Sequence, residues 1–225
     1  ISHSNIHGLL ASGDTLWIGT FEHGLDLMDV RTGRVFKHFD ASDKKGSLGN
    51  NFILNIIKKK DGNILLATGR GLYEFDQKKK EFLLMNYFPS YIFFTTLFED
   101  SNGVIWAGTW RDGLYYYNQH TGETGSMTFA ANESRSLRSN RINRIFEDSK
   151  KSIWVATEGG LSRLNKDFKS FTNYTTANGF PSNLILSMLE DDQGVLWIST
   201  TKGMVRFTPS GEVRVLTKAN GLLSN

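Results

Sequence analysis

The sequence predicts an all-β fold made of short strands and tight turns. Two features of its composition indicate this: 22 glycines accompany only 3 prolines in 225 residues, and aromatic side chains make up 12% of the chain. Glycine permits tight turns, and aromatic residues favour strands. The third and strongest observation is internal repetition, because one pattern recurs along the whole chain.

Five segments align with one another. They are "TLWIGTFEHGLDLMD" from Thr15, "NILLATGRGLYEFD" from Asn63, "VIWAGTWRDGLYYYN" from Val104, "SIWVATEGGLSRLN" from Ser152 and "VLWISTTKGMVRFT" from Val195. Their shared anchor positions are Trp17, Leu65, Trp106, Trp154 and Trp197. The anchors recur roughly every 40 to 50 residues, which is the period of a β-propeller blade.

Each copy predicts four antiparallel strands. An apolar first strand, such as residues 141–148, precedes a polar turn such as Ser101-Asn102-Gly103 and then the anchor strand. A short turn ending in Gly-Leu or Gly-Met opens the third strand, and a turn such as Thr121-Gly122 leads to an aromatic fourth strand. The sequence therefore predicts one propeller segment over residues 1–225, with blades at about 4–45, 50–88, 91–131, 139–176 and 182–219.

The anchor tryptophans are expected to fill the space between neighbouring blades, because a single blade cannot cover its own apolar faces. Leu65 in the same position supports this packing role, since it offers an apolar filler but no polar group.

Composition excludes several other classes. The net charge of +3 comes without a basic recognition helix, so no nucleic-acid partner is expected. The chain has no cysteine, and no apolar run is long enough to insert into a membrane. It begins at Ile1 without a signal peptide, so we expect a piece of a longer protein.

The repeat resembles the two-component regulator propeller family. The resemblance is carried by "SLRSNRINRIFEDSKKSIWVATEGGLSRLN" from Ser136 and "GFPSNLILSMLEDDQGVLWISTTKGMVRF" from Gly179, while Leu65 and the third copy's "YIFFTTLFED" depart from the pattern. It implies a periplasmic sensor domain of a bacterial hybrid histidine kinase, many of which control carbohydrate use. It also implies a seven-bladed propeller, of which five blades are present here.

A sixth copy is expected to start at Ser224-Asn225. Five blades could close on themselves, but the resemblance favours part of a larger ring. Its exposed sheet faces would then pack on neighbouring domains of the same chain or on a second copy in a homodimer.

No catalytic residue, metal site or cofactor is predicted. The five histidines (His3, His7, His23, His38 and His120) lack metal-ligand spacing and are expected in exposed or turn positions. Paired acids recur at Glu99-Asp100, Glu147-Asp148 and Glu190-Asp191. Such pairs serve glycosidases, but repetition at one blade position favours a structural role in the turn. "DQGVLW" from Asp192 resembles the Asp-box hairpin of sialidases, which is itself a structural turn.

Three lysine runs fall in turns on one face of the predicted blades. They are Lys58–Lys60, Lys78–Lys80 and Lys150-Lys151. These turns are expected to be solvated, and the alternative is a basic face that docks an anionic glycan, a lipid or a neighbouring domain.

Trp110 is the one tryptophan outside the anchor positions. It lies in the turn after the anchor strand, on the opposite face, where loops are free to vary and bind. An exposed indole beside Arg111 and Asp112 suits a sugar ring. The alternative is that Trp110 caps the core or packs on an adjoining domain. The candidate ligand-binding residues are Phe21, Glu22, His23, Arg70, Trp110, Arg111, Asp112, Glu158 and Lys202.

The sequence therefore favours a non-catalytic sensor module that binds an oligosaccharide and relays a packing change to a kinase. A glycan-active propeller enzyme, either a hydrolase or a lyase, and a protein-binding scaffold are the alternatives.

Overall fold

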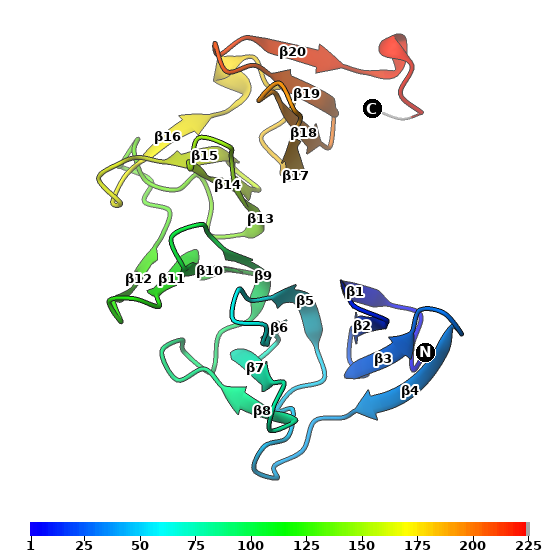
Figure 1. Ribbon diagram of the computed structural model, residues 1–225. Coiled ribbons are helices and arrows are strands. Elements are labelled where there is room, and N and C mark those ends of the chain that lie inside the picture. The colour runs from blue at the N-terminus through cyan, green and yellow to red at the C-terminus, as the bar shows by residue number, and fades with distance from the viewer. Residues whose placement is uncertain (224–225) are drawn as a thin grey trace. The chain divides into compact units, whose positions relative to one another are not determined.

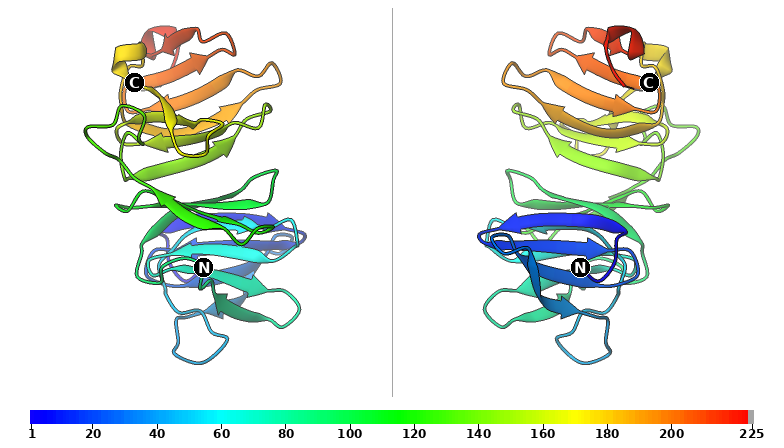
Figure 2. Two further views of the ribbon diagram at one scale, coloured as in Figure 1. Left: turned by 90° about the vertical axis from the view of Figure 1, so that its left-hand side faces the viewer. Right: turned by 90° about the vertical axis from the view of Figure 1, so that its right-hand side faces the viewer.

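The computed structural model describes residues 1–223, which form twenty strands in five four-stranded antiparallel sheets (Figure 1). In every sheet the strands follow one another in chain order. Figure 2 shows the ribbon from two further sides. Ser224 and Asn225, where we expect a sixth repeat, lie outside the described residues. The prediction of an all-β fold with four-stranded antiparallel blades is confirmed.

The chain divides into two compact units, which are described separately. Unit 1 comprises Ile1–Glu99, Gly103–Thr109 and Tyr116–Thr124; unit 2 comprises Asp100–Asn102, Trp110–Tyr115 and the chain from Gly125 onward. The division runs through the third sheet.

The first two sheets belong to unit 1. The first contains β1 (Ile6–Ser12), β2 (Thr15–Thr20), β3 (Leu25–Asp29) and β4 (Arg34–Phe39). The second contains β5 (Ile53–Lys58), β6 (Ile64–Thr68), β7 (Leu72–Asp76) and β8 (Glu81–Leu84). The third sheet contains β9 (Phe94–Glu99), β10 (Val104–Thr109), β11 (Leu114–Asn118) and β12 (Thr124–Met127).

The last two sheets belong to unit 2. The fourth contains β13 (Ile142–Glu147), β14 (Ile153–Thr157), β15 (Gly160–Leu164) and β16 (Phe171–Tyr174), followed by the short 3₁₀ helix η1 (Thr176–Asn178). The fifth contains β17 (Ile185–Glu190), β18 (Leu196–Thr200), β19 (Gly203–Phe207) and β20 (Val213–Leu216), followed by η2 (Lys218–Asn220).

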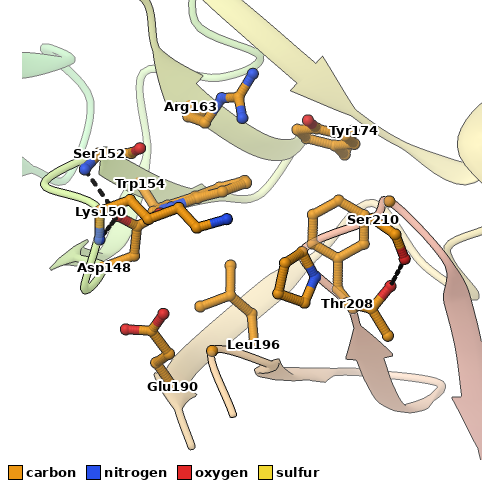
Figure 3. Close-up of a pocket in the computed structure, with 14 residues that line it drawn as sticks. Asp148, Lys150, Ser152, Trp154, Arg163, Tyr174, Glu190, Leu196, Thr208 and Ser210 are labelled. Carbon is orange, nitrogen blue, oxygen red and sulfur yellow. Dashed lines mark hydrogen bonds between the residues drawn. The ribbon is translucent and has the colours of Figure 1, made fainter. Parts of the chain in front are cut away.

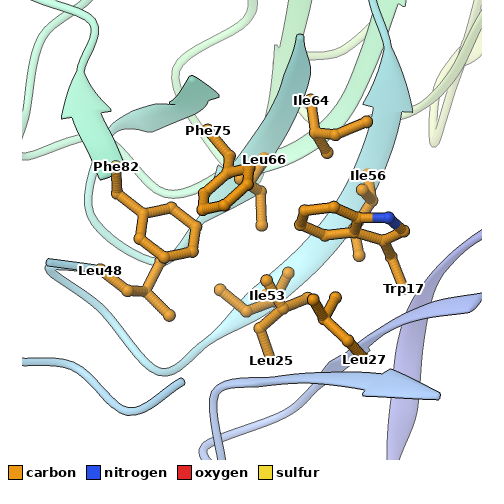
Figure 4. Close-up of a cluster of buried hydrophobic side chains, with 10 residues drawn as sticks. All are labelled: Trp17, Leu25, Leu27, Leu48, Ile53, Ile56, Ile64, Leu66, Phe75 and Phe82. Carbon is orange, nitrogen blue, oxygen red and sulfur yellow. The ribbon is translucent and has the colours of Figure 1, made fainter. Parts of the chain in front are cut away.

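One hydrophobic core of unit 1 lies between its first two sheets (Figure 4). Trp17 contributes its indole from β2, and Phe75 meets it edge-on with 5.2 Å between ring centroids. The sheets approach closely at Gly19, where an added Cβ would lie 2.5 Å from Cγ2 of Ile53. A side chain at that position would therefore push the two sheets apart.

Unit 2 has an equivalent core between the fourth and fifth sheets. Trp154 on β14 packs with Phe207 on β19 at 6.0 Å between ring centroids. Trp17, Trp106 and Trp154 are at most 4% exposed, as expected for fillers between sheets, and Leu65 is 1% exposed. Trp197 on the last sheet is only partly buried.

Candidate functional site

In two of the three predicted pairs, the second acid holds both its own turn and the anchor indole. Asp148 accepts hydrogen bonds from the backbone amides of Lys150 (2.9 Å) and Ser152 (2.8 Å) through Oδ1, and from Nε1 of Trp154 (2.8 Å) through Oδ2. Asp191 accepts the same kind of bond from Nε1 of Trp197 at 2.7 Å. This bond comes first among those that lower the pKa of Asp191 below its usual 3.8.

The first acid of each pair holds the turn of the preceding sheet. Glu190 accepts from the backbone amide of Ser149 at 2.6 Å and from its hydroxyl at 2.8 Å. Glu147 makes the same two bonds to Ser101, at 2.9 and 2.6 Å. In unit 1, Glu99 accepts from the amide of Lys60 at 2.7 Å. The acid pairs are therefore scaffold, and their carboxylates are engaged in turn hydrogen bonds.

Lys59 occupies the position that Asp148 and Asp191 hold in their sheets, six residues before Leu65 instead of a tryptophan. Its side chain is only 7% exposed, and Nζ lies 2.8 Å from Glu74 and 2.9 Å from Asp61. The expectation that this lysine run is solvated or forms a basic docking face is thus wrong for Lys59. Because residue 65 is a leucine, a carboxylate at residue 59 would have no indole N–H from which to accept a hydrogen bond. The ion pairs of Lys59 with Glu74 and Asp61 take the place of that bond.

Tyr87 and Tyr117 stack beside this ion pair, with 3.7 Å between ring centroids. Both rings line the same cavity as Lys59 and Glu74. Burial raises the pKa of Tyr87 to about 12. These two rings supply aromatic packing where the second sheet lacks its anchor tryptophan.

Four of the nine candidate binding residues lie in unit 1. Phe21 is half-buried and packs edge-on against Phe52, with 4.8 Å between centroids, so its ring has a packing role. His23 stacks on His3 at 4.2 Å, and Glu22 and Arg70 are exposed. Glu22 has a φ of 76°, a backbone conformation that serves the turn.

The other five candidates lie in unit 2, where the structure links two of them. The guanidinium of Arg141 lies 4.8 Å from the ring centroid of Trp110, and its Nη1 lies 3.1 Å from Oε2 of Glu158. Trp110 is 45% exposed, so one cation occupies part of its surface and the rest faces solvent. Arg111, Asp112 and Lys202 are exposed.

Sequence reasoning missed Arg141. It directly precedes β13, just as Phe52 directly precedes β5, and each contacts the aromatic turn residue of the preceding sheet. That shared register was readable in the repeat alignment. We call Trp110, Arg141 and Glu158 the indole–arginine patch.

A groove also lies between the fourth and fifth sheets (Figure 3). Its cavity of about 180 Å³ is lined by Trp154, Tyr174 and Phe207, with Lys150 and Arg163 at its wall. Asp148 and Glu190 also line it, so its lining holds charges of both signs.

Possible metal ligands and membrane-spanning helices can be described for residues 1–223. No group of three or more histidine, aspartate or glutamate side chains there could hold a metal ion. None of the helices in this range has the length and apolar character needed to span a bilayer.

Comparison with known proteins places this geometry in context. The family described as "two component regulator propeller" matches residues 87–111, 136–159 and 179–202. "Histidine kinase P4" of Formosa agariphila is 26% identical over 175 residues, covering 72% of this chain and 12% of that protein. The chain thus spans a small part of this curated relative.

Solved structures share the fold. The extracellular domain of the hybrid two-component system BT3049 from B. thetaiotaomicron matches 99% of this chain and 30% of its own, with a TM-score of 0.80 and 23% identity. A streptogramin B lyase matches 96% of this chain and 70% of its own, with a TM-score of 0.69 and 17% identity. PorZ, from the type-IX secretion system of Porphyromonas gingivalis, matches 98% and 35%, with a TM-score of 0.73 and 14% identity. The chain therefore has the β-propeller fold, and three of its segments match the two-component regulator propeller repeat.

Proposed function

We propose that this chain is the sensor propeller of a hybrid two-component histidine kinase and works outside the cytoplasm, in the periplasm. The family match, the histidine kinase relative and the extracellular domain of BT3049 support this role. The kinase, a histidine kinase coupled to a response regulator, lies in other parts of the parent protein.

We further propose that the indole–arginine patch contacts the ligand, an oligosaccharide. The observation that carries this proposal is the 45% exposure of Trp110 beside a guanidinium that Glu158 holds in place. A pyranose ring stacks its apolar face on an indole. A carboxylate accepts hydrogen bonds from the sugar hydroxyls, and a guanidinium donates hydrogen bonds to them. Because Glu158 already orients Arg141, ligand binding loses little conformational entropy in ordering that side chain.

Ligand binding is proposed to shift the packing of this propeller against neighbouring domains or against a second copy in a homodimer. The signal can be no larger than the difference in ligand affinity between the two arrangements. No catalytic residue of this chain is required for that role.

The test is calorimetric titration of the chain with a panel of neutral and acidic oligosaccharides. Trp110→Ala should weaken binding of the responding glycan about tenfold, since a stacked aromatic contact contributes about 1–1.5 kcal/mol. Its melting temperature should stay close to that of the parent, because the indole is not in a core. Tyr91→Ala removes another exposed ring, 79% exposed, and serves as the matched control.

Each other outcome selects a different role. Conversion of any glycan to a product supports a propeller enzyme. Absence of binding to every glycan supports a protein-binding scaffold. A large drop in melting temperature with unchanged affinity assigns Trp110 to packing.

A further inference from the structure

A second groove lies between the first two sheets, entirely within unit 1. Its cavity of about 500 Å³ falls within the range of ligand pockets. Four aromatic rings line it: Trp17, Phe36, Phe39 and Phe75. Trp17 and Phe75 are buried core residues, whereas Phe36 is 59% exposed on β4, the edge strand of its sheet. The groove thus has a rigid aromatic floor and one ring available at its mouth.

Two lysines complete the lining. Nζ of Lys37 lies 5.2 Å from the ring centroid of Phe39, which is a cation–π contact. Lys80 comes from the turn between β7 and β8, where its φ of 59° fixes an unusual backbone conformation. Neither ammonium belongs to an ion pair with a carboxylate of residues 1–223.

The lining of this groove contains no aspartate or glutamate. This sets it apart from the groove between the fourth and fifth sheets, where Asp148 and Glu190 stand beside Lys150 and Arg163. The first groove therefore presents two positive charges that no carboxylate of its lining offsets. An anion entering it gains attraction from both and meets no like charge.

We propose that this groove binds a small anion that carries a flat apolar ring face, as an aryl carboxylate or a uronic acid does. The ring lies on the aromatic floor, and the carboxylate faces the ammonium groups of Lys37 and Lys80. One lysine of the Lys78–Lys80 run is thereby assigned to a ligand site, while its neighbours remain turn residues. This site is independent of the indole–arginine patch, because it shares no residue with it.

Two pairs of probes test the proposal by calorimetry or NMR titration at millimolar concentration. Phenylacetate is compared with the neutral 2-phenylethanol, and D-glucuronate with D-glucose. We expect at least one acid to bind and its neutral partner to bind about tenfold more weakly. The pair that responds identifies the aromatic acid or the sugar acid as the ligand type.

The variant is Lys37→Met combined with Lys80→Asn, because asparagine tolerates the backbone conformation at residue 80. It should lower the affinity for the acid about tenfold and flatten the salt dependence of binding. Lys78→Asn changes the same turn without touching the groove, so its affinity should match that of the parent. Trp110→Ala should also leave this binding unchanged, which separates this site from the proposed oligosaccharide contact.

Absence of binding by both acids overturns the proposal. So does equal binding of acids and neutral partners, or full affinity in the double variant with its melting temperature retained.

Discussion

Trp154 donates its indole N–H to Asp148 across 2.8 Å, and the same carboxylate accepts two backbone amides of the turn between them. The Asp148 side chain thus links the turn between β13 and β14 to Trp154, the indole that packs between the fourth and fifth sheets. Both partners are buried, at 9% and 3% exposure, so water cannot readily replace the bond. Trp197 and Asp191 repeat the arrangement at 2.7 Å.

Asp148→Ala should lower the free energy of unfolding by about 2–3 kcal/mol. The substitution leaves a buried indole N–H and two turn amides without their acceptor, and an unsatisfied buried donor costs about 1–3 kcal/mol. Urea denaturation followed by tryptophan fluorescence measures the change. Asp192→Ala removes an exposed acid with no such role and should change stability by less than about 0.5 kcal/mol. Equal effects of the two substitutions would contradict this account.

Lys59→Met should be strongly destabilising, by about 3–5 kcal/mol, because it leaves Glu74 as an uncompensated charge that is only 13% exposed. Although burial opposes the charged form, the hydrogen bonds to Glu74 and Asp61 raise the pKa of Lys59, so the lysine stays charged. The double variant Lys59→Met with Glu74→Leu removes both charges and should recover most of the loss. Thermal and urea unfolding of the three proteins tests this, and a double variant no better than the single one would refute it.

Ser149 and Glu190 should show an energetic coupling, although they lie 41 residues apart in sequence. The coupling from a double-mutant cycle of Ser149→Ala and Glu190→Ala should be about 1 kcal/mol, the value of a typical hydrogen bond at an exposed site. The backbone amide of Ser149 stays bonded to Glu190 in the single serine variant, so the cycle reports the hydroxyl bond. Strictly additive losses would show that the hydroxyl contact contributes nothing.

His38 predicts a pH dependence of stability in unit 1. Its Nδ1 lies 2.5 Å from Oδ1 of the buried Asp26, and its Nε2 lies 3.2 Å from Asp40. Partial burial disfavours the charged ring, but the hydrogen bonds to the two carboxylates outweigh it and raise the pKa of His38 above 6.5. The stabilisation is therefore fully present below pH 6.5 and is lost as the pH rises through the raised pKa.

Melting temperatures between about pH 5.5 and 9 should fall across this window in the parent protein. His38→Gln should remove that fall, whereas His120→Gln, in an exposed turn, should preserve it. A parent melting temperature that is flat above pH 6.5 would count against the His38 contact.

Much of this fold could be predicted because the residues that recur in the repeat are those that pack between neighbouring sheets. A tryptophan that recurs with a fixed register before a Gly-Leu turn marks the strand between two sheets, and three of the four anchor indoles are buried accordingly. The recurrence of the acid pairs also indicated a structural role, which their turn hydrogen bonds explain. In the second copy, Leu65 replaces the tryptophan and Lys59 replaces the aspartate. The two replacements could have been linked from the sequence, since these two positions are hydrogen-bonded to each other in the fourth and fifth sheets.

The site was less predictable because side-chain partners come from different sheets. Trp110 was singled out as an exception to the repeat, but its cation comes from Arg141, thirty-one positions later along the chain. Phe21 looked equivalent to Trp110 by position, yet Phe52 gives it an apolar partner and half-buries it. The neighbour decides whether such a ring is covered, and the neighbour belongs to another repeat. The grooves likewise form from two sheets and leave no motif in either.

The glutamate that begins each acid pair reaches back to the turn of the previous sheet, at Lys60, Ser101 and Ser149. The third, fourth and fifth copies thus each carry an acceptor for the preceding copy, and the second, third and fourth copies each carry a donor for the following one. Tandem duplication of one such unit in the gene would supply both the glutamate acceptor and the turn donor that join the new sheet to its neighbours. Lengthening or shortening the array by whole units therefore requires no new side chain at the join.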